Sequence, residues 1–414
     1  MNFMKQVWLL NHYAKAPSDP GGTRHFHLAD HLKAFGWEAC IIAASIDHAT
    51  GQQRLGSKEP HRLENLQGVP FLWINTPAYS GNGGGRVLNM LAYTLAVLRR
   101  KTTAVLPRPD VVIGSTVHPF AAVAGALLAR RFKVPFIFEV RDLWPQTLID
   151  MGRLREGSLI TWALRRLERW LYSRAAITVV LLPQAWQYIV PLGIAKELVI
   201  WIPNGVDFSL FPRPEPKVAS EDGPFTLMYF GAHGQANDLD TLLEAMAHLQ
   251  LMGNGQGILL RLIGDGPLKS ALMSRAEGFG LRNVQFEPPV PKSQIPALAA
   301  QADAFVIPIS NLPNLYRFGV SPNKLFDYLA AERPILIASD IANNPVAEAR
   351  AGIVVPPSQP KALADAIVQI AHTPLVERQQ MGRSGRQYVE KNYNFSILAK
   401  RLSETLDAVV KEGK

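Results

Sequence analysis

The segment Val320–Leu336, which reads VSPNKLFDYLAAERPIL, places a cation and a carboxylate near the start of an expected helix. Ser321 is a good N-cap and Pro322 suits the first helical position, so Asn323 and Lys324 lie in the first turn. The start of a helix directs free backbone N–H groups and the positive end of its dipole outwards. Such a helix start can bind a diphosphate, and Lys324 adds a full charge to it.

Asp327 lies one turn beyond Lys324, on about the same face of the helix. A carboxylate in this position can accept hydrogen bonds from both hydroxyls of a ribose. A well-capped surface helix with an ion pair between Lys324 and Asp327 would have the same pattern. The motif alone therefore leaves a nucleotide site and a surface ion pair both open.

The segment Leu262–Lys269, LIGDGPLK, reads as a strand, a glycine turn and a helix. Gly264 and Gly266 allow the backbone to approach a ligand closely. The third glycine of the dinucleotide fingerprint is missing, because Lys269 stands in its place, and this disfavours NAD binding. A tight turn between strand and helix needs glycine even without a ligand, so this interpretation also stays open.

The first half of the chain has a similar loop in Asp19–Phe26, DPGGTRHF, after the first apolar run. Gly21 and Gly22 free the backbone there, and Thr23 is expected to cap a helix that begins at Arg24. The first strand–helix loop of a doubly wound sheet lies at the carboxyl edge, where ligands bind. A plain helix start is the alternative.

Two further polar segments follow strands of the first half, STVHPF (residues 115–120) and FEVRDLWP (residues 138–145). They place His118, Glu139, Arg141 and Asp142 at or near the same edge. A single histidine is more often structural than catalytic, and an Arg–Asp pair is often only an ion pair. Four polar groups near one edge nevertheless indicate a candidate site.

The elements that must position these residues alternate between strand and helix. Short, continuous apolar runs separated by helical patterns indicate parallel strands covered on both faces. The first half has expected strands at residues 4–11, 39–44, 111–114, 136–140 and 177–182, and an expected helix at about 24–35. The pattern restarts with strands at residues 226–230, 258–263, 284–286, 304–308 and 334–338, and helices at 240–249 and 267–276.

Two doubly wound Rossmann-like domains are the natural interpretation of this restart. We expect the first at residues 1–195, the second at 196–385, and C-terminal helices at 386–414 that pack back on the first. The proline-containing segment 206–223 is the expected linker.

Composition sets further limits on the class of protein. The 414 residues are 48% hydrophobic and 19% charged, as in an ordinary globular protein. The single cysteine, Cys40, cannot form an internal disulfide and lies in an apolar run, where a buried inert thiol is expected. No stretch approaches the ~20 apolar residues that span a bilayer. These features favour a cytoplasmic location.

Charge is spread unevenly along the chain. Residues 1–200 hold 23 basic and 13 acidic residues, whereas residues 201–414 hold 20 and 21. A basic half indicates an anionic partner, or only a solvated basic surface. One candidate element is the apolar helix expected at Arg86–Arg100, with Arg99, Arg100 and Lys101 at its end. It is either buried against the sheet or lies in an anionic membrane surface.

Several chemistries have no support in the sequence. No cluster of His, Cys, Asp and Glu has the spacing of metal ligands, so we expect no metal cofactor. The nucleophile-elbow and phosphate-loop motifs are both missing. Basic residues are not interleaved with aromatic ones, so a nucleic-acid partner is not expected.

The motifs together resemble the family 4 retaining glycosyltransferases of the GT-B fold, in which two Rossmann-like domains face a cleft. PNGVD at Pro203–Asp207 resembles the interdomain motif, and YFGAHGQANDLDTLLEAM resembles the start of the second domain. IGDGP and FGVSPNKLFDYLAAERPIL resemble the nucleotide-side loop and the donor-binding helix. GGTRHFHLADHL, STVHPF and EVRDLWP are most similar to bacterial O-antigen and capsule enzymes, including L-N-acetylfucosamine transferases.

The resemblance implies roles for particular residues. Asn323 and Lys324 would hold the diphosphate, Asp327 the ribose, and Pro289 or Val290 would lie against the base. The implied catalytic residues are His118, Arg141, Lys324 and Asp327. The implied donor-binding residues are Gly21, Gly22, Gly231, Gly264, Asp265, Val290, Ser321, Asn323, Lys324 and Asp327.

Two features of the sequence depart from the family's pattern, namely the pair of glutamates and the basic pair. The family usually has two glutamates separated by seven residues, but Asp327 is one methylene shorter than the second, and Gly319 stands at the first. The basic pair that commonly follows the first strand of the second domain is also missing. His233, Gln235 and Asn237 occupy that loop. Contacts to the donor sugar and phosphates are the ones affected, and Lys324 is the candidate replacement.

The resemblance implies transfer of a sugar, with an N-acetylated deoxyhexose as one candidate, from a UDP-linked or other nucleotide donor without a metal ion. The implied acceptor is a saccharide on a polyprenyl diphosphate, at the inner face of an anionic membrane. A nucleotide-sugar 2-epimerase or hydrolase, or a non-catalytic nucleotide-sugar-binding protein, are the alternatives.

Overall fold

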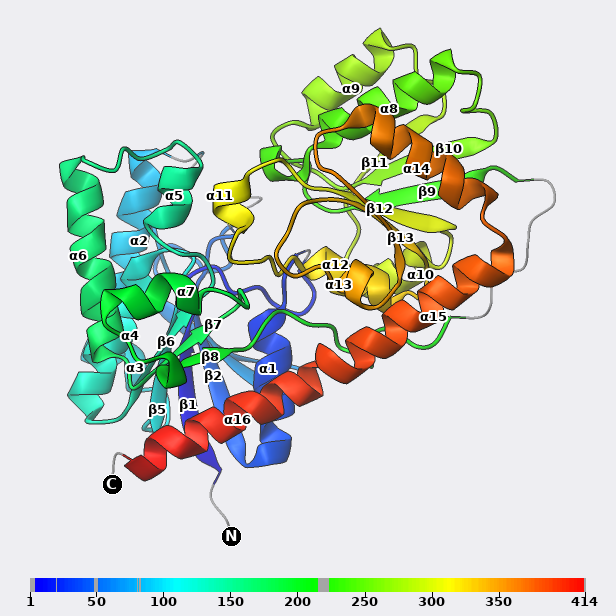
Figure 1. The fold of residues 1–414 in the computed structure, drawn as a ribbon. Helices are drawn as coiled ribbons and strands as arrows, with labels where there is room; N and C mark the ends of the chain where they lie inside the picture. The colour runs from blue at the N-terminus through cyan, green and yellow to red at the C-terminus, as the bar shows by residue number, and fades with distance from the viewer. Residues whose placement is uncertain are drawn as a thin grey trace. The chain divides into compact units, whose positions relative to one another are not determined.

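The computed structural model describes residues 4–19, 21–47, 51–79, 81, 83–214 and 223–412 (Figure 1). The chain forms two compact units, and the first is discontinuous. Met1–Pro203 and Phe395–Lys414 form the first unit, and Asn204–Asn394 form the second. Each unit has its own sheet, flanked by helices, so the expected pair of doubly wound domains is confirmed.

The first sheet has eight strands in the order β3-β4-β2-β1-β5-β6-β7-β8. Every neighbouring pair is parallel except β3 and β4, which form an antiparallel hairpin at one edge. The sequence analysis missed both strands of this hairpin: β3 is mostly exposed and lacks an apolar run, whereas β4 is a buried apolar run that was overlooked. The strands are β1 (Lys5–Leu10), β2 (Trp37–Ala44), β3 (His61–Leu66), β4 (Val69–Ile74), β5 (Val111–Ser115), β6 (Phe136–Val140), β7 (Ile177–Val180) and β8 (Val199–Trp201).

The helices of the first unit form two layers. The chain moves in opposite directions along the sheet from β1 to β2 and from β5 to β6, so right-handed crossovers place α1 and α4 on opposite faces. Helix α1 packs against α16, and α4 packs against both α2 and α6 (Figure 1). The helices are α1 (Arg24–Leu32), α2 (Gly84–Val97), α3 (Arg100–Thr103), α4 (Pro119–Phe132), α5 (Gln146–Asp150), α6 (Leu159–Arg174), α7 (Trp186–Ile189) and α16 (Phe395–Glu412).

The core of the first unit joins residues from both ends of the chain. Leu398, Leu402 and Leu406 of α16 lie in one apolar cluster with Leu28 and Leu32 of α1. Burial also raises the pKa of the Cys40 thiol on β2 to about 12, as expected for an inert cysteine.

The second sheet has six parallel strands in the order β11-β10-β9-β12-β13-β14. Its strands are β9 (Phe225–Phe230), β10 (Ile258–Ile263), β11 (Val284–Glu287), β12 (Ala304–Pro308), β13 (Ile335–Ala338) and β14 (Gly352–Val355). Its helices are α8 (Leu239–Leu251), α9 (Lys269–Gly278), α10 (Ile295–Ala299), α11 (Pro313–Tyr316), α12 (Asn323–Ala330), α13 (Pro345–Glu348), α14 (Pro360–His372) and α15 (Leu375–Asn392).

The division between the units differs in detail from the expected boundaries. The first unit continues past residue 195, because β8 pairs with β7 and completes the first sheet. Of the expected linker, residues 206–214 belong to the second unit and residues 215–222 lie outside the described part. Among the C-terminal helices, α16 packs on the first unit, whereas α15 packs on α12 of the second.

Candidate functional site

The second sheet reverses its strand order between β9 and β12, and ligands bind at such reversals in doubly wound sheets. The loops that follow these two strands contact each other. The Ser310 amide donates to the Ala236 carbonyl at 3.3 Å, and Lys324 Nζ donates to Asn237 Oδ1. The predicted diphosphate residue Lys324 therefore lies at the expected place in the topology.

The Lys324 ammonium is held by neutral groups. Its Nζ donates to Tyr229 Oη at 2.7 Å and lies 4.4 Å from the centre of the Tyr229 ring. Desolvation lowers the pKa of Lys324 to about 7. An anion bound beside Nζ would favour the charged form of Lys324. Binding of a phosphate there would therefore be accompanied by uptake of a proton by Nζ. The sequence analysis missed Tyr229, and it noted Asn237 only as an occupant of the loop.

The helix start differs from the expected one. Helix α12 begins at Asn323 with Pro322 at the N-cap, and no side chain caps it. The Ser321 hydroxyl accepts instead from the Asn204 amide at 2.8 Å, and the Ser321 carbonyl accepts from Asn204 Nδ2. The predicted cap at Ser321 is therefore wrong. The Leu325 amide donates to the Pro322 carbonyl at 3.2 Å, and a helix start without a side-chain cap can direct its remaining free N–H groups at a ligand.

Asp327 pairs with a lysine from another loop. Lys292, which follows Val290 after β11, donates from Nζ to Asp327 Oδ2 at 2.5 Å. The side chain of Asp327 is 8% exposed, and that of Lys292 is 14% exposed. The alternative of a surface ion pair between Lys324 and Asp327 is wrong. Sequence spacing gave no signal for Lys292, because the two partners lie on different elements.

The glycine loops pack tightly against each other. A Cβ on Gly264 would lie 1.9 Å from the Gly231 carbonyl oxygen, so the two loops can approach only with glycine at Gly264. A Cβ on Gly231 would lie 3.4 Å from Lys324 Nζ, which places this loop beside the lysine. Asp265 is exposed and accepts from the Gly266 amide at 2.8 Å, and Val290 is half-buried.

The backbone explains why the family's first carboxylate is missing. Gly319 has a φ of 94°, a left-handed conformation in which a glutamate would be strained. Asn343 fixes the next residue, because its side chain exchanges hydrogen bonds with the backbone of Val320. A carboxylate at this position would need a different loop.

His233 occupies the loop where the family's basic pair is missing. Its ring is buried, and neither ring nitrogen has a hydrogen-bond partner. Desolvation lowers the pKa of His233 to about 4, and the charge of Lys269 adds to this effect. The imidazole is therefore neutral at pH 7 and does not replace a basic pair.

The first sheet reverses between β1 and β5, and two histidines meet there. His12 follows β1, His118 follows β5, and their ring centres are 4.7 Å apart. His12 Nε2 donates to Asn89 Oδ1 at 2.6 Å. The sequence analysis missed His12, although it is among the first polar residues after the first strand.

His118 is buried at the N-cap of α4, and neither ring nitrogen has a hydrogen-bond partner. Desolvation lowers its pKa well below the usual value, helped by the charges of His12 and Arg86. A neutral imidazole with unused nitrogens can hydrogen-bond a hydroxyl.

Glu139, unlike the other expected edge residues, is buried in a network of hydrogen bonds. It accepts from Arg24 Nη2 at 3.0 Å, from His25 Nε2 at 2.6 Å and from Ser115 Oγ at 2.5 Å. The Arg24 guanidinium also binds the Ile202 carbonyl at 2.9 Å. Desolvation acts to raise the pKa of Glu139, but the charge of Arg24 and the hydrogen bonds from His25 and Ser115 hold it well below its usual range. This closed network joins α1, β5 and β6 to the chain after β8.

The remaining predicted residues of the first unit lie at the same edge. Gly21 and Gly22 are exposed, and Thr23 is the N-cap residue of the helix that begins at Arg24, as expected, although its side chain makes no capping hydrogen bond. Arg141 is half-buried, and its backbone amide donates to Thr116 Oγ1 at 2.9 Å.

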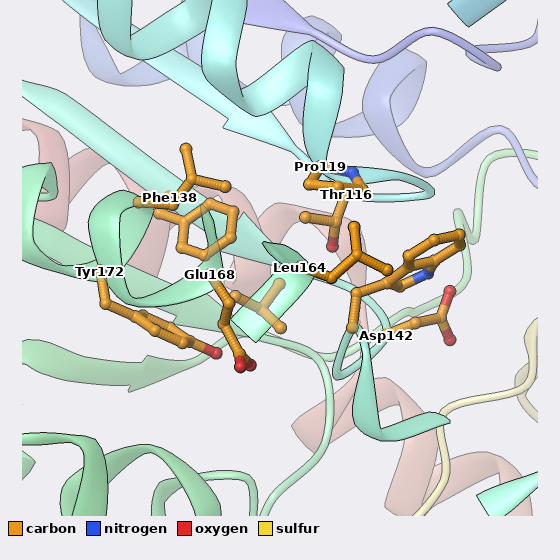
Figure 2. A pocket seen from close by; sticks show the side chains of 10 residues that line it. Thr116, Pro119, Phe138, Asp142, Leu164, Glu168 and Tyr172 are labelled. Atoms are coloured by element: carbon orange, nitrogen blue, oxygen red, sulfur yellow. The ribbon is translucent and has the colours of Figure 1, made fainter. Parts of the chain in front are cut away.

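A narrow hollow opens beside this edge (Figure 2). Its empty space is about 300 Å³, counting the part open to solvent, and Thr116, Asp142 and Trp144 are among its lining residues. Burial raises the pKa of Glu168, which lines the hollow on α6, to about 8. Tyr188 Oη donates to Glu168 Oε2 at 3.0 Å, and Oε1 has no partner.

Two features are absent from the described ranges of the chain. No group of three or more His, Cys, Asp and Glu side chains in these ranges is arranged to hold a metal ion. Within the same ranges, no helix combines the length and apolar character needed to span a bilayer.

Comparison with known families covers most of the chain. Residues 21–205 match the glycosyl transferase 4-like domain, and residues 224–373 match the glycosyl transferases group 1 domain. With two Rossmann-like units, these matches define a glycosyltransferase of the GT-B fold. The chain belongs to the family 4 type, and its 4-like domain precedes its group 1 domain.

Proteins with sequences similar to this chain are also named as glycosyltransferases. "Probable glycosyltransferase WbjE" of Pseudomonas aeruginosa is 24% identical over 76% of this chain and 78% of its own length. WcaL of Escherichia coli K12, named provisionally as a colanic acid biosynthesis glycosyltransferase, is 24% identical over 53% of each chain. HepE of Anabaena, solved with UDP and glucose, has the same fold, with a TM-score of 0.66 and 16% identity over 98% of this chain and 99% of its own.

Proposed function

We propose that this enzyme transfers a sugar from a nucleoside diphosphate, with retention of configuration, to a lipid-diphosphate-linked saccharide in bacterial surface polysaccharide synthesis. The observation that carries the proposal is the start of α12, where Lys324 and the Lys292–Asp327 pair lie beside an uncapped helix start. WcaL's name supports a role in polysaccharide synthesis. Because HepE was solved with UDP, UDP is the first donor nucleotide to test.

In the proposed reaction, the bond between the sugar C1 and the diphosphate oxygen breaks, and C1 bonds to an acceptor hydroxyl oxygen on the same face. The acceptor proton goes to the leaving phosphate. Lys324 and the N–H groups of α12 stabilise the negative charge on the leaving group. Asp327 accepts from the ribose, and neutral His118 hydrogen-bonds a sugar hydroxyl. No protein nucleophile is assigned.

We further propose that the donor needs no divalent cation and that the enzyme acts at the cytoplasmic face of an anionic membrane. Lysine and the helix dipole provide the positive field that a metal ion would otherwise supply. A membrane location follows from the lipid on the acceptor and from the basic excess of residues 1–200.

The test combines a panel of UDP-, GDP- and dTDP-sugars with a synthetic lipid-diphosphate saccharide. Nucleoside diphosphate release only with acceptor, and an NMR spectrum with the donor's anomeric configuration, support the proposal. Release without acceptor indicates a hydrolase or 2-epimerase, and binding without release indicates a sensor. Full loss of activity in EDTA, restored by magnesium, would contradict metal independence.

A further inference from the structure

Helix α6 begins with an unusual set of exposed apolar side chains. Leu159 is 85% exposed, Ile160 64% and Trp162 60%. The helix start is well formed, because the Ser158 hydroxyl accepts from the Thr161 amide at 3.2 Å, and Thr161 itself is buried. These three exposed residues therefore lie in a well-formed first turn of a helix.

Helix α2 has a second set of this kind. One side of it is buried, where Asn89 donates to Thr76 Oγ1 at 2.9 Å and Tyr93 Oη donates to the Ile42 carbonyl at 2.6 Å. The other side is exposed and apolar. We call the exposed residues of both helices the apolar edge: Val87, Leu88, Leu91, Leu95, Leu159, Ile160 and Trp162.

The two sets belong to one layer of the first unit, since α4 packs against both helices (Figure 1). A helix that follows a parallel strand starts at the carboxyl edge of the sheet. The start of α2 follows β4, and the start of α6 follows β6 and α5. The apolar edge therefore begins on the side of the sheet where His118 and Arg141 lie.

The charge around α6 is basic. Residues 153–174 contain six arginines and two glutamates. Arg153, Arg155, Arg166 and Arg169 are exposed, and the Arg166 guanidinium lies 4.9 Å from the centre of the Trp162 ring. Tryptophan beside arginine is typical of segments that lie at a membrane–water interface. Exposed apolar patches of this kind mark interaction surfaces.

We propose that the apolar edge is the surface by which this enzyme docks on an anionic lipid bilayer. Its leucine, isoleucine and tryptophan side chains enter the headgroup region, and the arginines of residues 153–169 bind lipid phosphates. The proposal rests on the proposed function in one respect, namely that the acceptor is a membrane lipid. It brings that lipid to the edge of the sheet that holds His118.

This surface shares helix α2 with the one expected from the sequence, but its basic residues are different ones. Helix α2 ends at Val97, and Arg99, Arg100 and Lys101 lie beyond its end. They are therefore at the far end of α2 from the carboxyl edge. The apolar residues, and the arginines around α6, carry the docking.

The test is co-sedimentation with vesicles of phosphatidylglycerol and phosphatidylethanolamine, compared with vesicles of phosphatidylcholine alone. The variant L159S/I160S/W162S should partition at least about tenfold more weakly onto the anionic vesicles. It should keep its melting temperature and its turnover of a short-chain, water-soluble acceptor. The matched control is L251S/M252S, which changes exposed apolar residues of the second unit, Leu251 (85% exposed) and Met252.

Equal sedimentation of wild type and the α6 variant would overturn the proposal. So would a wild-type dimer in light scattering that the variant abolishes, because a second copy would then cover the edge. R99Q/R100Q/K101Q should weaken partitioning onto the anionic vesicles less than the α6 variant does. If it weakens partitioning more, the basic residues after α2 are the docking surface and the proposal is wrong. If wild type docks but transfers no sugar to any lipid acceptor, the proposed function fails and the docking surface stands.

Discussion

The two sheets reverse their strand order in the same way, yet their reversal points have different chemistry. In the first unit, His12 and His118 meet between β1 and β5. In the second, Asn237 and Lys324 meet between β9 and β12. Burial lowers the pKa of His118 and of Lys324, but His118 is neutral at pH 7 whereas Lys324 is close to half-protonated.

This difference indicates a division of tasks within one fold. A neutral imidazole suits hydroxyl groups, and a lysine that gains its proton on binding suits a phosphate. In the proposed function, topology determines where each part of the site lies, and one buried side chain in each part determines which portion of the substrate it binds. The comparison predicts separate effects on turnover, donor binding and acceptor use.

The largest effect is expected for Lys324→Ala. Loss of one preorganised donor to the leaving group should lower kcat by roughly 100- to 1,000-fold, without unfolding the protein. Steady-state kinetics and a melting curve measure the two effects. Lys361→Ala, at an exposed lysine on α14, is the matched control. Activity within threefold of wild type would remove Lys324 from the site.

A smaller effect is expected from the Asp327–Lys292 pair. Asp327→Ala should raise the donor KM by roughly tenfold to a hundredfold, because hydrogen bonds to a charged group are lost in both ground and transition states. Asp327→Glu should be tolerated, since the resemblance places Glu there. Lys292→Met should reduce the preference for UDP over 2′-deoxy-UDP in calorimetry, because Lys292 orients Asp327. An unchanged preference would show that Lys292 does not act through the ribose.

The pH dependence should come next in size. The pKa of Lys324 is about 7 in the free protein, and a bound diphosphate raises it, so binding takes up a proton above pH 7. Affinity for a nucleoside diphosphate should fall between pH 7.5 and 9.5, by at most about tenfold per unit. Calorimetry in buffers of different ionisation enthalpy measures the proton uptake. Lys324→Arg should abolish this dependence, because arginine stays charged.

The smallest effect is expected at the first reversal point. His118→Phe keeps an aromatic ring but removes one neutral hydrogen bond, so turnover should fall about tenfold. Calorimetric affinity for the nucleoside diphosphate alone should not change, because no phosphate is assigned to His118. A loss of diphosphate affinity as large as that of Lys324→Ala would contradict the division of tasks.

Periodicity and loop position predicted the two sheets, a helix start one residue before that of α12, and the edge positions of His118 and Arg141. In the missed β3–β4 hairpin, the outer strand β3 is polar and exposed, whereas β4 is an apolar run that the same criterion could have identified. The N-cap position of Thr23 was correct although its side chain makes no capping hydrogen bond, and the predicted cap at Ser321 was wrong because its hydroxyl accepts from the Asn204 backbone amide. Lys292 was missed because a side-chain partner from another loop depends on tertiary packing, which residue spacing does not encode.

The discontinuous first unit has a consequence for protein synthesis. Helix α16 supplies Leu398, Leu402 and Leu406 to the cluster around α1, and Lys5 Nζ donates to Asp407 Oδ1 at 2.5 Å. A ribosome completes the whole second unit before it translates these residues. The apolar side of α1 must therefore wait uncovered while some 190 residues of Asn204–Asn394 emerge. Chaperone binding to the nascent chain should accordingly persist until translation passes α16.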